Sequence, residues 1–473
     1  MADSNARSDG GAGTDGRPNV LWVFMDDVCP WMSCYGHDAV ETEHVDALAD
    51  RGVRFDRAYS TAPVCTPSRS AVVTGMYQTT IGAHNHYSSF ETWRGIEMDE
   101  WDPTHLGVRT MPEIFRSAGY YTFNEGKNHY NFVDRDRMLY DRKGDDPGFH
   151  GATGGTEWSG RDPGQPFFGQ VQLTGGKATV SDDVDRVDPE SVTVPPYYPD
   201  HPVYREEIAH HYDTIQEMDR ILGDVVAALR RDDLYEDTVV WFFSDHGMRL
   251  PRHKQFCYEG GIRVPMVVAG PGVPAGVARE DLVSGIDVGP TSLSLAGIDV
   301  PRHVQGRDAL DEDFHRDHVV AARDRCDYTI DRIRAVVGDR YKYVRNFMTD
   351  RPYLQPQYRD GEEFVTVLKD LHERGELDEV QSRFVSEERP AEELYDLRTD
   401  PHETENLVHS PEREHREALG RLRNALHRWI AETGDRGEFP ESEAALSAVL
   451  DRWGDDAVNP EYDEVRRRRG DGE

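Results

Sequence analysis

The sequence predicts an α/β fold built on a mostly parallel β-sheet that helices cover. Two uninterrupted apolar runs of strand length, Asn19 to Met25 and Thr238 to Phe243, are typical of strands buried on both faces, as in a parallel sheet. Between them, apolar residues recur every three or four positions from Ile208 to Leu229. This spacing predicts a long amphipathic helix whose apolar face packs on the sheet.

The other predicted elements follow from shorter patterns. Pro67 falls in the first turn of one predicted helix, where its missing N–H costs nothing, and Gly119 ends another. The expected helices run from Thr42 to Asp50, Pro67 to Thr74, Met111 to Ala118 and Asp287 to Ala296. The expected strands run from Val53 to Tyr59, Tyr120 to Phe123, Phe167 to Leu173 and Val264 to Ala269.

The chain changes character near Arg302. Beyond it, the segments 333–337 and 340–344 alternate around a Gly338–Asp339 turn, as in an antiparallel hairpin, and long charged helices follow. We therefore predict a large domain over residues 18–310 and a C-terminal α+β subdomain over residues 311–460. A Gly-rich leader, residues 1–17, is expected to be disordered, and a charged tail, residues 461–473, is expected to be frayed.

Composition excludes several classes of partner. The 473 residues include 54 basic and 89 acidic side chains, a formal charge of −35, so nucleic acids and anionic lipids would be repelled. With 37% apolar residues the chain can form a packed core, yet no apolar run approaches the roughly 20 residues of a membrane helix. We expect a globular protein without nucleic-acid or membrane partners.

Lysine is rare in this chain. Only six of the 54 basic residues are lysines. An acidic, lysine-poor surface is typical of proteins that work in molar salt, where a Debye length of about 3 Å screens self-repulsion. We therefore expect a halophilic source and give weight to the three lysines that fall in motifs, Lys127, Lys177 and Lys254.

The cysteines indicate a reducing compartment. They form neither a C-x-x-C pair nor a dense disulfide framework, and they are Cys29, Cys34, Cys65, Cys257 and Cys326. The leader has no apolar core and no twin arginine of the kind found in secretory signals. Both observations predict a cytoplasmic location.

Polar clusters follow both long apolar strands. Asp26 and Asp27 come directly after the first strand, and Ser244-Asp245-His246-Gly247 ends the second. In open α/β sheets, ligands bind at the carboxyl ends of the strands. Adjacent carboxylates at such a place repel one another, so they need a cation between them.

A further cluster surrounds Cys65 in the segment Cys65-Thr66-Pro67-Ser68-Arg69. A cysteine just before a helix N-terminus, with an arginine four residues on, lies in a positive potential that stabilises a negatively charged nucleophile or substrate. An isolated cysteine is more often a small buried apolar residue. The surrounding motif favours a functional role here.

C-x-P-S-R is the signature of the type I sulfatases, and this sequence resembles that family at several separated places. The matches run in the family's order from residue 19 to about 407. They are NVLWVFMDD at 19–27, CTPSR at 65–69, GKNH at 126–129, SDHG at 244–247, Lys254 with YEGGIRVP at 258–265, and ELYDL at 393–397 with Asp400-Pro401, Glu403 and Asn406-Leu407. The segment from Lys254 to Pro265 also resembles the heparan N-sulfatase branch.

The resemblance implies a fold and a reaction. The fold is that of the alkaline phosphatase superfamily: a large α/β domain around a mostly parallel sheet, with a smaller C-terminal domain carrying an antiparallel sheet. In such enzymes the cysteine, here Cys65, is oxidised to formylglycine by a formylglycine-generating enzyme, and its hydrated aldehyde attacks sulfur and later expels sulfate. The implied activity is hydrolysis of a sulfate ester, or an N-sulfate, on a carbohydrate or other small organic molecule.

The resemblance also implies residue roles. Arg69 would hold the hydrated aldehyde, and the groups gripping the sulfate and nucleophile would be Lys127, His129 and Lys254. The residues expected to bind a cation are Asp26, Asp27, Asp245 and His246. Because most of these ligands are hard oxygens, Ca²⁺ is expected, with Mg²⁺ the second choice.

The sequence departs from the family pattern after Phe168. Many sulfatases have a histidine-containing H-x-P-H segment here, which supplies a general acid for the leaving alcohol. This chain reads QVQLTGGK at 170–177, without a histidine. Gln172 and Lys177 are our candidates for substrate contact, and His253 is the candidate proton donor.

Two other functions compete with sulfate ester hydrolysis. Relatives with the same formylglycine site cleave phosphonate or phosphate esters, and Lys127, Lys254 and Arg69 could serve either substrate. A non-catalytic binding protein is the second alternative, but every expected catalytic position except the proton donor is filled.

Overall fold

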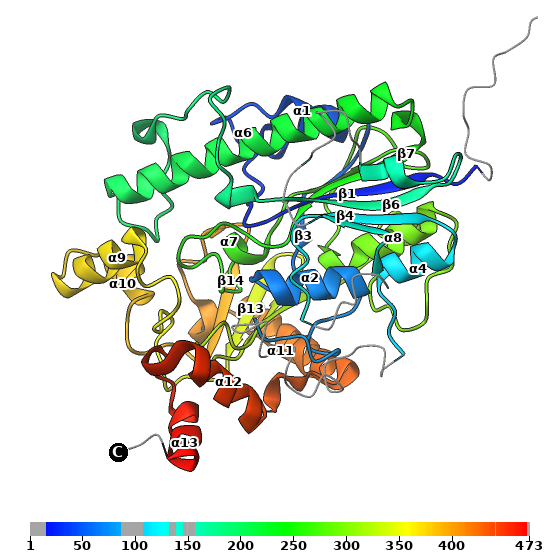
Figure 1. Ribbon diagram of the computed structural model, residues 1–473. Helices are drawn as coiled ribbons and strands as arrows, with labels where there is room; N and C mark the ends of the chain where they lie inside the picture. Colours follow the sequence, from blue (N-terminus) through cyan, green and yellow to red (C-terminus); the bar gives the residue numbers. More distant parts are fainter. Residues whose placement is uncertain are drawn as a thin grey trace, which may run out of the picture.

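An eight-stranded sheet forms the centre of the structure, a computed structural model that describes residues 16–86, 107–131, 139–144, 149, 157–439 and 441–470 (Figure 1). In spatial order its strands are β5 (Arg142–Gly144), β4 (Tyr121–Glu125), β6 (Phe167–Leu173), β1 (Asn19–Met25), β7 (Thr238–Ser244), β8 (Met266–Ala269), β2 (Gly52–Phe55) and β9 (Val277–Arg279). The first five are parallel, β8 is antiparallel to both neighbours, and β9 is parallel to β2. The predicted, mostly parallel sheet is confirmed.

Helices cover both faces of this sheet (Figure 1). One face carries α1 (Glu43–Asp50) and α6 (Pro202–Arg231), and the other carries α2 (Cys65–Thr74), α4 (Met111–Ser117) and α8 (Val288–Leu295). The alternation of β1 explains this sandwich, because successive side chains of a strand point to opposite faces. Leu21, Val23 and Met25 pack with the α6 side, and Val20, Trp22 and Phe24 pack with α4 and α8.

A second, antiparallel sheet forms the C-terminal part, also as predicted. Its strands are β11 (Val319–Arg323), β12 (Ile333–Val337), β13 (Tyr341–Asn346) and β14 (Glu392–Asp396). One face packs on α11 (Arg413–Thr433) through Leu422 and Trp429. The other face packs on Tyr59 and on Ile262 of the short helix α7 (Glu259–Ile262), so the two sheets are joined by continuous apolar packing.

Smaller elements complete the described chain. β3 (Ala58–Tyr59) pairs with β10 (Val283–Ser284), and the peripheral helices are α9 (Glu363–Glu373), α10 (Glu379–Arg383), α12 (Glu443–Trp453) and α13 (Pro460–Arg469). Short 3₁₀ helices are η1 (Ser33–Tyr35), η5 (Glu157–Gly160), η6 (Gly175–Lys177), η7 (Pro189–Ser191), η8 (Tyr235–Asp237), η9 (Gly285–Asp287), η10 (Leu407–His409), η11 (Arg436–Glu438) and η12 (Gly454–Asp456).

Three local predictions need correction. The single strand expected from Val53 to Tyr59 is divided into β2 and β3, which join different sheets. The expected frayed tail is largely the helix α13, anchored because Tyr462 is fully buried. Residues 1–15 of the expected leader and 471–473 of the tail lie outside the described residues, but Arg17 belongs to the folded structure, since it donates a hydrogen bond to the Ala118 carbonyl oxygen at 2.6 Å.

The chain passes from the first sheet to the second between Leu295, where α8 ends, and Val319, where β11 begins. The boundary at residue 310 stays a prediction within this interval. Among the described residues, none of the helices combines the length and apolar composition that a membrane span requires.

Candidate active site

The predicted site residues meet at the carboxyl edge of the large sheet. Asp26 and Asp27 directly follow β1, Asp245 directly follows β7, and Lys127 lies two residues after β4. These strands are parallel members of one sheet, so their following loops emerge on the same side. Cys65 joins them from the first turn of α2, with its sulfur 3.2 Å from His246 Nε2.

Three side chains offer metal-ligand atoms within 4.8 Å of one another and of the Cys65 sulfur, namely Asp26, Asp245 and His246. Asp27 completes the group, since its Oδ1 is 3.2 Å from His246 Nε2. All four side chains are buried. This donor set, mostly carboxylate oxygens, fits a hard cation such as Ca²⁺ or Mg²⁺.

The His246 ring is held in the tautomer that a metal ligand requires. Its Nδ1 lies 2.8 Å from the Gly247 carbonyl oxygen. Because a carbonyl oxygen only accepts hydrogen bonds, the proton sits on Nδ1. The Nε2 lone pair is then directed toward Asp27 and Asp245, as in metal-binding histidines.

Arg69 links the carboxylates from the protein side. Its Nε donates to Asp245 Oδ2 at 2.8 Å, and its Nη2 donates to Asp26 Oδ1 at 3.0 Å. The guanidinium also lies over the Phe24 ring, 4.3 Å from the centroid, and is almost fully buried. Arg69 therefore fixes the two aspartates relative to each other.

Three of the six lysines converge on the same carboxylates. Lys127 Nζ lies 2.8 Å from both Asp26 oxygens. Lys177 Nζ lies 2.6 Å from Asp26 Oδ2 and 3.0 Å from Asp27 Oδ2. Lys254 Nζ donates to Asp27 Oδ1 at 2.8 Å and lies 3.5 Å from the Cys65 sulfur.

The positive charge exceeds the negative charge in this site. Arg69 and the three lysines oppose three carboxylates, and a divalent cation would add two further positive charges. Burial raises the pKa of Asp26, but Lys127, Lys177 and Arg69 lower it well below its usual range. Burial and Asp26 raise the pKa of Asp245, to about 7. The surplus suits an anionic ester.

The Cys65 sulfur lies in the same field. Burial and Asp26 raise the pKa of this thiol, but Lys127, Lys254 and Lys177 lower it well below the usual value for cysteine. Burial lowers the pKa of the nearby His129 to about 4, although Cys65 acts in the opposite direction. A negatively charged group at this position is therefore stabilised by the surrounding cationic side chains.

The segment 170–177, which lacks the histidine of the family pattern, places Lys177 through close backbone contacts with the aspartate pair. Gly176 N donates to the Asp26 carbonyl oxygen at 2.9 Å. A Cβ on Gly175 would lie 1.8 Å from that oxygen, and Gly175 has a φ of +55°, which disfavours other residues. The two glycines therefore let η6 wrap tightly around the aspartate pair, with Lys177 at its end.

Two expected substrate contacts have protein partners in the structure, and their substrate roles stay predictions. Gln172 is buried, its Oε1 accepts from Arg69 at 2.6 Å, and its Nε2 donates to Asn124 at 2.9 Å, so it supports Arg69. His253, the expected proton donor, is also buried. Its Nε2 is 2.9 Å from the Tyr197 hydroxyl and its Nδ1 is 3.6 Å from Cys29 Sγ.

Two side chains that the sequence analysis did not predict, His86 and Asp327, also lie at the site. His86 lies close enough to the Cys65 sulfur for that sulfur to help raise its pKa, and its Nδ1 is 3.3 Å from Asp327 Oδ2 of the C-terminal part. The signal available in the sequence was weak: His84-Asn85-His86 is a polar stretch after α2, and RDRCD at 323–327 follows an apolar strand.

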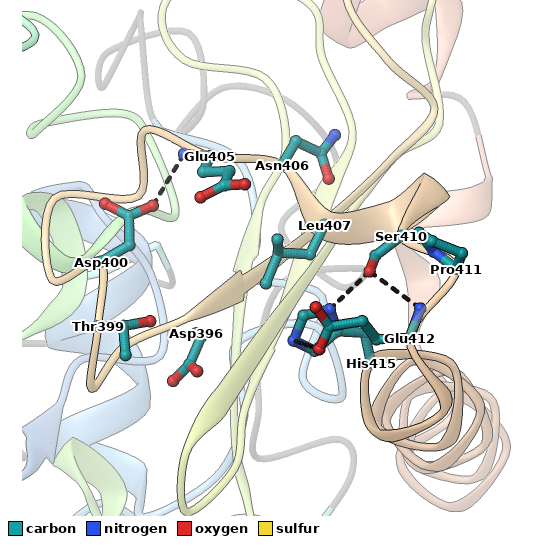
Figure 2. Close-up of a pocket in the computed structure, with 10 residues that line it drawn as sticks. All are labelled: Asp396, Thr399, Asp400, Glu405, Asn406, Leu407, Ser410, Pro411, Glu412 and His415. Carbon is teal, nitrogen blue, oxygen red and sulfur yellow. Dashed lines mark hydrogen bonds and ion pairs between the residues drawn. The ribbon is translucent and has the colours of Figure 1, made fainter.

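A separate surface pocket lies between the loop after β14 and the start of α11 (Figure 2). Its volume is about 450 Å³. Its lining includes no lysine or arginine but four acidic residues, Asp396, Asp400, Glu405 and Glu412. An anionic ester would be repelled there, so the cluster around Cys65 is the better candidate site.

Comparison with known proteins agrees with this geometry. The sulfatase family model matches residues 18–184 and 152–298, and a model described as N-sulphoglucosamine sulphohydrolase, C-terminal, matches residues 246–387. The chain belongs to the sulfatase family, and it is an enzyme that hydrolyses sulfate esters.

Individual relatives cover most of the chain. An ulvan-active sulfatase of Formosa agariphila is 32% identical, over 90% of this chain and 77% of its own length. Human N-sulphoglucosamine sulphohydrolase is 27% identical, over 89% of this chain and 91% of its own length. The crystal structure of a phosphonate monoester hydrolase of Agrobacterium radiobacter shares the fold, with a TM-score of 0.64, 18% identity, and coverage of 88% and 96% of the two chains.

Proposed function

We propose that this sulfatase acts through a formylglycine made from Cys65 and a Ca²⁺ ion, with Mg²⁺ as the second choice, bound by Asp26, Asp27, Asp245 and His246. One observation carries the proposal: Cys65 lies at the start of α2, within 3.5 Å of both Lys254 Nζ and His246 Nε2. A nucleophile at this position would stand beside the metal ligands and beside a cationic group for the sulfate. Maturation would need a formylglycine-generating enzyme as partner.

The modified residue supplies two geminal hydroxyls when hydrated: one attacks sulfur, and the other later expels sulfate as the aldehyde re-forms. The chain's own residues would prepare these steps. Arg69, held by Gln172, keeps Asp26 and Asp245 in place. Lys127, Lys177 and Lys254 surround the sulfate with positive charge as negative charge builds on its oxygens. His129, neutral because burial lowers its pKa to about 4, can accept a proton from a hydroxyl.

The bound ion would supply charge neutralisation for the sulfate oxygens and the nucleophile. Asp26, Asp27 and Asp245 would bind it through oxygens and His246 through Nε2, the ring nitrogen that faces the carboxylates. The fixed tautomer of His246 and the buried Arg69 network would orient these ligands.

A sulfated glycan is the substrate class that we propose. The relatives at 32% and 27% identity are named for action on ulvan and on N-sulphoglucosamine. A site with four cationic side chains can also hold a phosphonate, and the hydrolase from Agrobacterium radiobacter with the same fold makes that the second candidate.

Competing substrates separate the two candidates. An ester with a second negative charge is disfavoured where no extra cation pairs with it in a desolvated site. On preparations with Cys65 fully converted, aryl sulfate should therefore be hydrolysed with a kcat/KM at least about tenfold above that for the matching aryl phosphate. We expect the same order against the matching aryl phosphonate, which carries a single negative charge like the sulfate. The reverse order would favour the phosphonate hydrolase.

We also propose a cytoplasmic enzyme of a halophile. All five cysteines are free, which suits a reducing compartment. The charge of −35 with only six lysines suits molar salt. Three of those six lysines lie in the site. A chain that has few lysines elsewhere but keeps three around Cys65 is consistent with both proposals, the halophilic source and the function of these lysines.

A further inference from the structure

We propose that His86, oriented by Asp327, is the general acid that protonates the leaving alcohol oxygen. This inference rests on the proposed sulfate transfer to the nucleophile formed at Cys65. The segment 170–177 lacks the histidine that the family pattern leads one to expect as general acid, and Gln172 in this segment accepts a hydrogen bond from Arg69. His86 would take the role that this segment leaves open.

The histidine and the aspartate form a nearly enclosed pair beside the nucleophile. The His86 ring lies close enough to the Cys65 sulfur for that sulfur to help raise the His86 pKa. Its Nδ1 lies 3.3 Å from Asp327 Oδ2, and the two side chains are only 13% and 9% exposed. Asp327 on Nδ1 leaves Nε2 as the nitrogen that can transfer a proton to substrate, the arrangement of an aspartate–histidine pair in hydrolases.

The backbone fixes this pair from two distant parts of the chain. His86 N donates to the Arg325 carbonyl oxygen at 2.8 Å, and Arg325 N donates to Asn85 Oδ1 at 3.0 Å. Beyond them, Cys326 and Thr329 exchange two backbone hydrogen bonds of 2.9 Å, which form a tight turn. Asp327 stands in this turn with a φ of +50°, a strained conformation of the kind that collects at functional sites.

The other groups near Cys65 suit different tasks. Lys254 is tied to both oxygens of Asp27, at 2.8 and 3.1 Å. His129 is buried and neutral, so it accepts protons. Burial lowers the pKa of His86, but Asp327 and Cys65 together raise it above its ordinary value, so the ring of His86 carries a proton more readily than a free histidine.

The proposed step balances as follows. The nucleophile's hydroxyl gives its proton to His129 as its oxygen forms a bond to sulfur. The bond between sulfur and the alcohol oxygen breaks with its electron pair remaining on the alcohol oxygen. This pair takes the proton from His86 Nε2, so that the alcohol leaves neutral and the imidazolium becomes imidazole. Asp327 orients the ring and stabilises the imidazolium before transfer.

Leaving-group dependence tests the proposal, because general acid catalysis matters most for poor leaving groups. His86→Ala should lower kcat/KM for phenyl sulfate by about 10²–10⁴, the usual contribution of a general acid. For 4-nitrophenyl sulfate, whose phenolate leaves without a proton, the loss should be less than about tenfold. Asp327→Asn should show the same inequality with smaller losses.

A surface histidine supplies the control. His315 has a 75% exposed side chain that pairs with Asp317, and His315→Ala should leave both rates unchanged. Equal losses on the two sulfates in His86→Ala, or no loss, would overturn the proposal. If His86→Ala does not fold, the same comparison with Asp327→Asn decides. The wild-type rate on 4-nitrophenyl sulfate reports the proposed function, whereas the ratio of the two losses reports this inference alone.

Discussion

Lys254→Ala is the substitution that most sharply tests how the site handles charge. The Lys254 side chain is 2% exposed and lies between the Asp27 carboxylate and the Cys65 sulfur. Its backbone is held independently, since Lys254 N donates to the Met248 carbonyl oxygen at 3.1 Å and Arg359 donates to the Lys254 carbonyl oxygen at 3.2 Å. The substitution should therefore remove an ammonium group without moving the loop.

The expected effect on turnover is large. An ammonium beside the nucleophile stabilises charge that develops on oxygen, and removal of one such donor costs about 10²–10³ in rate, or about 2.7–4 kcal/mol. Stability should change less. Breaking a buried ion pair can cost about 3–5 kcal/mol, but Asp27 keeps Lys177 at 3.0 Å, so its charge stays paired and the fold should survive.

The assay compares kcat/KM on an aryl sulfate with the melting temperature of the same preparation. Lys369→Ala is the matched control, because Lys369 is a surface lysine, 37% exposed, that pairs only with Asp360 in the described structure. It should leave turnover unchanged. If Lys254→Ala kept normal kinetics and only melted earlier, Lys254 would be a structural lysine and the reasoning from lysine scarcity would fail.

Three other outcomes are expected. Chelation should abolish activity and Ca²⁺ or Mg²⁺ should restore it, because three buried carboxylates gather there; an Asp245→Asn enzyme with normal metal binding and turnover would remove Asp245 from the ligand set. Asp331→Asn should lower the free energy of unfolding by about 3–5 kcal/mol, measured by denaturant titration, since it strands the buried Arg323 and Arg389. Burial raises the Asp331 pKa, but Arg323 and Arg389 together lower it by more. The stabilisation should therefore hold above the ordinary carboxyl pKa and disappear as the pH falls through the lowered pKa. A stability difference between wild type and variant that does not depend on pH would contradict this expectation. Raising KCl from millimolar to molar should raise the melting temperature by screening the charge of −35, and a fall would oppose a halophilic source.

Much of the fold was predictable because its core strands are apolar on both faces. The bounds of β1 and β6 agree with the predicted strands, and β7 differs by one residue. The predicted helix from Ile208 to Leu229 is the central part of α6, which begins earlier, at Pro202, where the apolar spacing is not yet regular. The division into β2 and β3 was not predictable, because the apolar pattern of a strand in the sequence does not show which sheet each half of it joins.

The site was predictable where residues follow parallel strands. Asp26, Asp27 and Asp245 meet because β1 and β7 are neighbours, and the sequence already places them at strand ends. The pair of His86 and Asp327 was not predictable. It depends on a loop after α2 meeting a turn from the C-terminal sheet, 241 positions further along the chain, and no local pattern encodes that contact.

The contact between Gln172 and Arg69 was not predictable for a related reason. Its place on β6 was predicted, but its partner Arg69 comes from α2, and only the packed structure shows that the guanidinium occupies its amide oxygen. From the sequence alone, a polar side chain inside a buried strand could equally be a substrate contact or a support for another residue.

The most direct test of the whole account is the mass of the tryptic peptide that spans residues 58–69 and contains Cys65, taken from enzyme of the native host. Conversion of the thiol to formylglycine lowers this mass by about 18 Da, the difference between CH₂SH and CHO. We expect the lighter peptide, and sulfatase activity proportional to its fraction among preparations. A preparation that is active on sulfate esters and contains only the unmodified thiol would contradict the account.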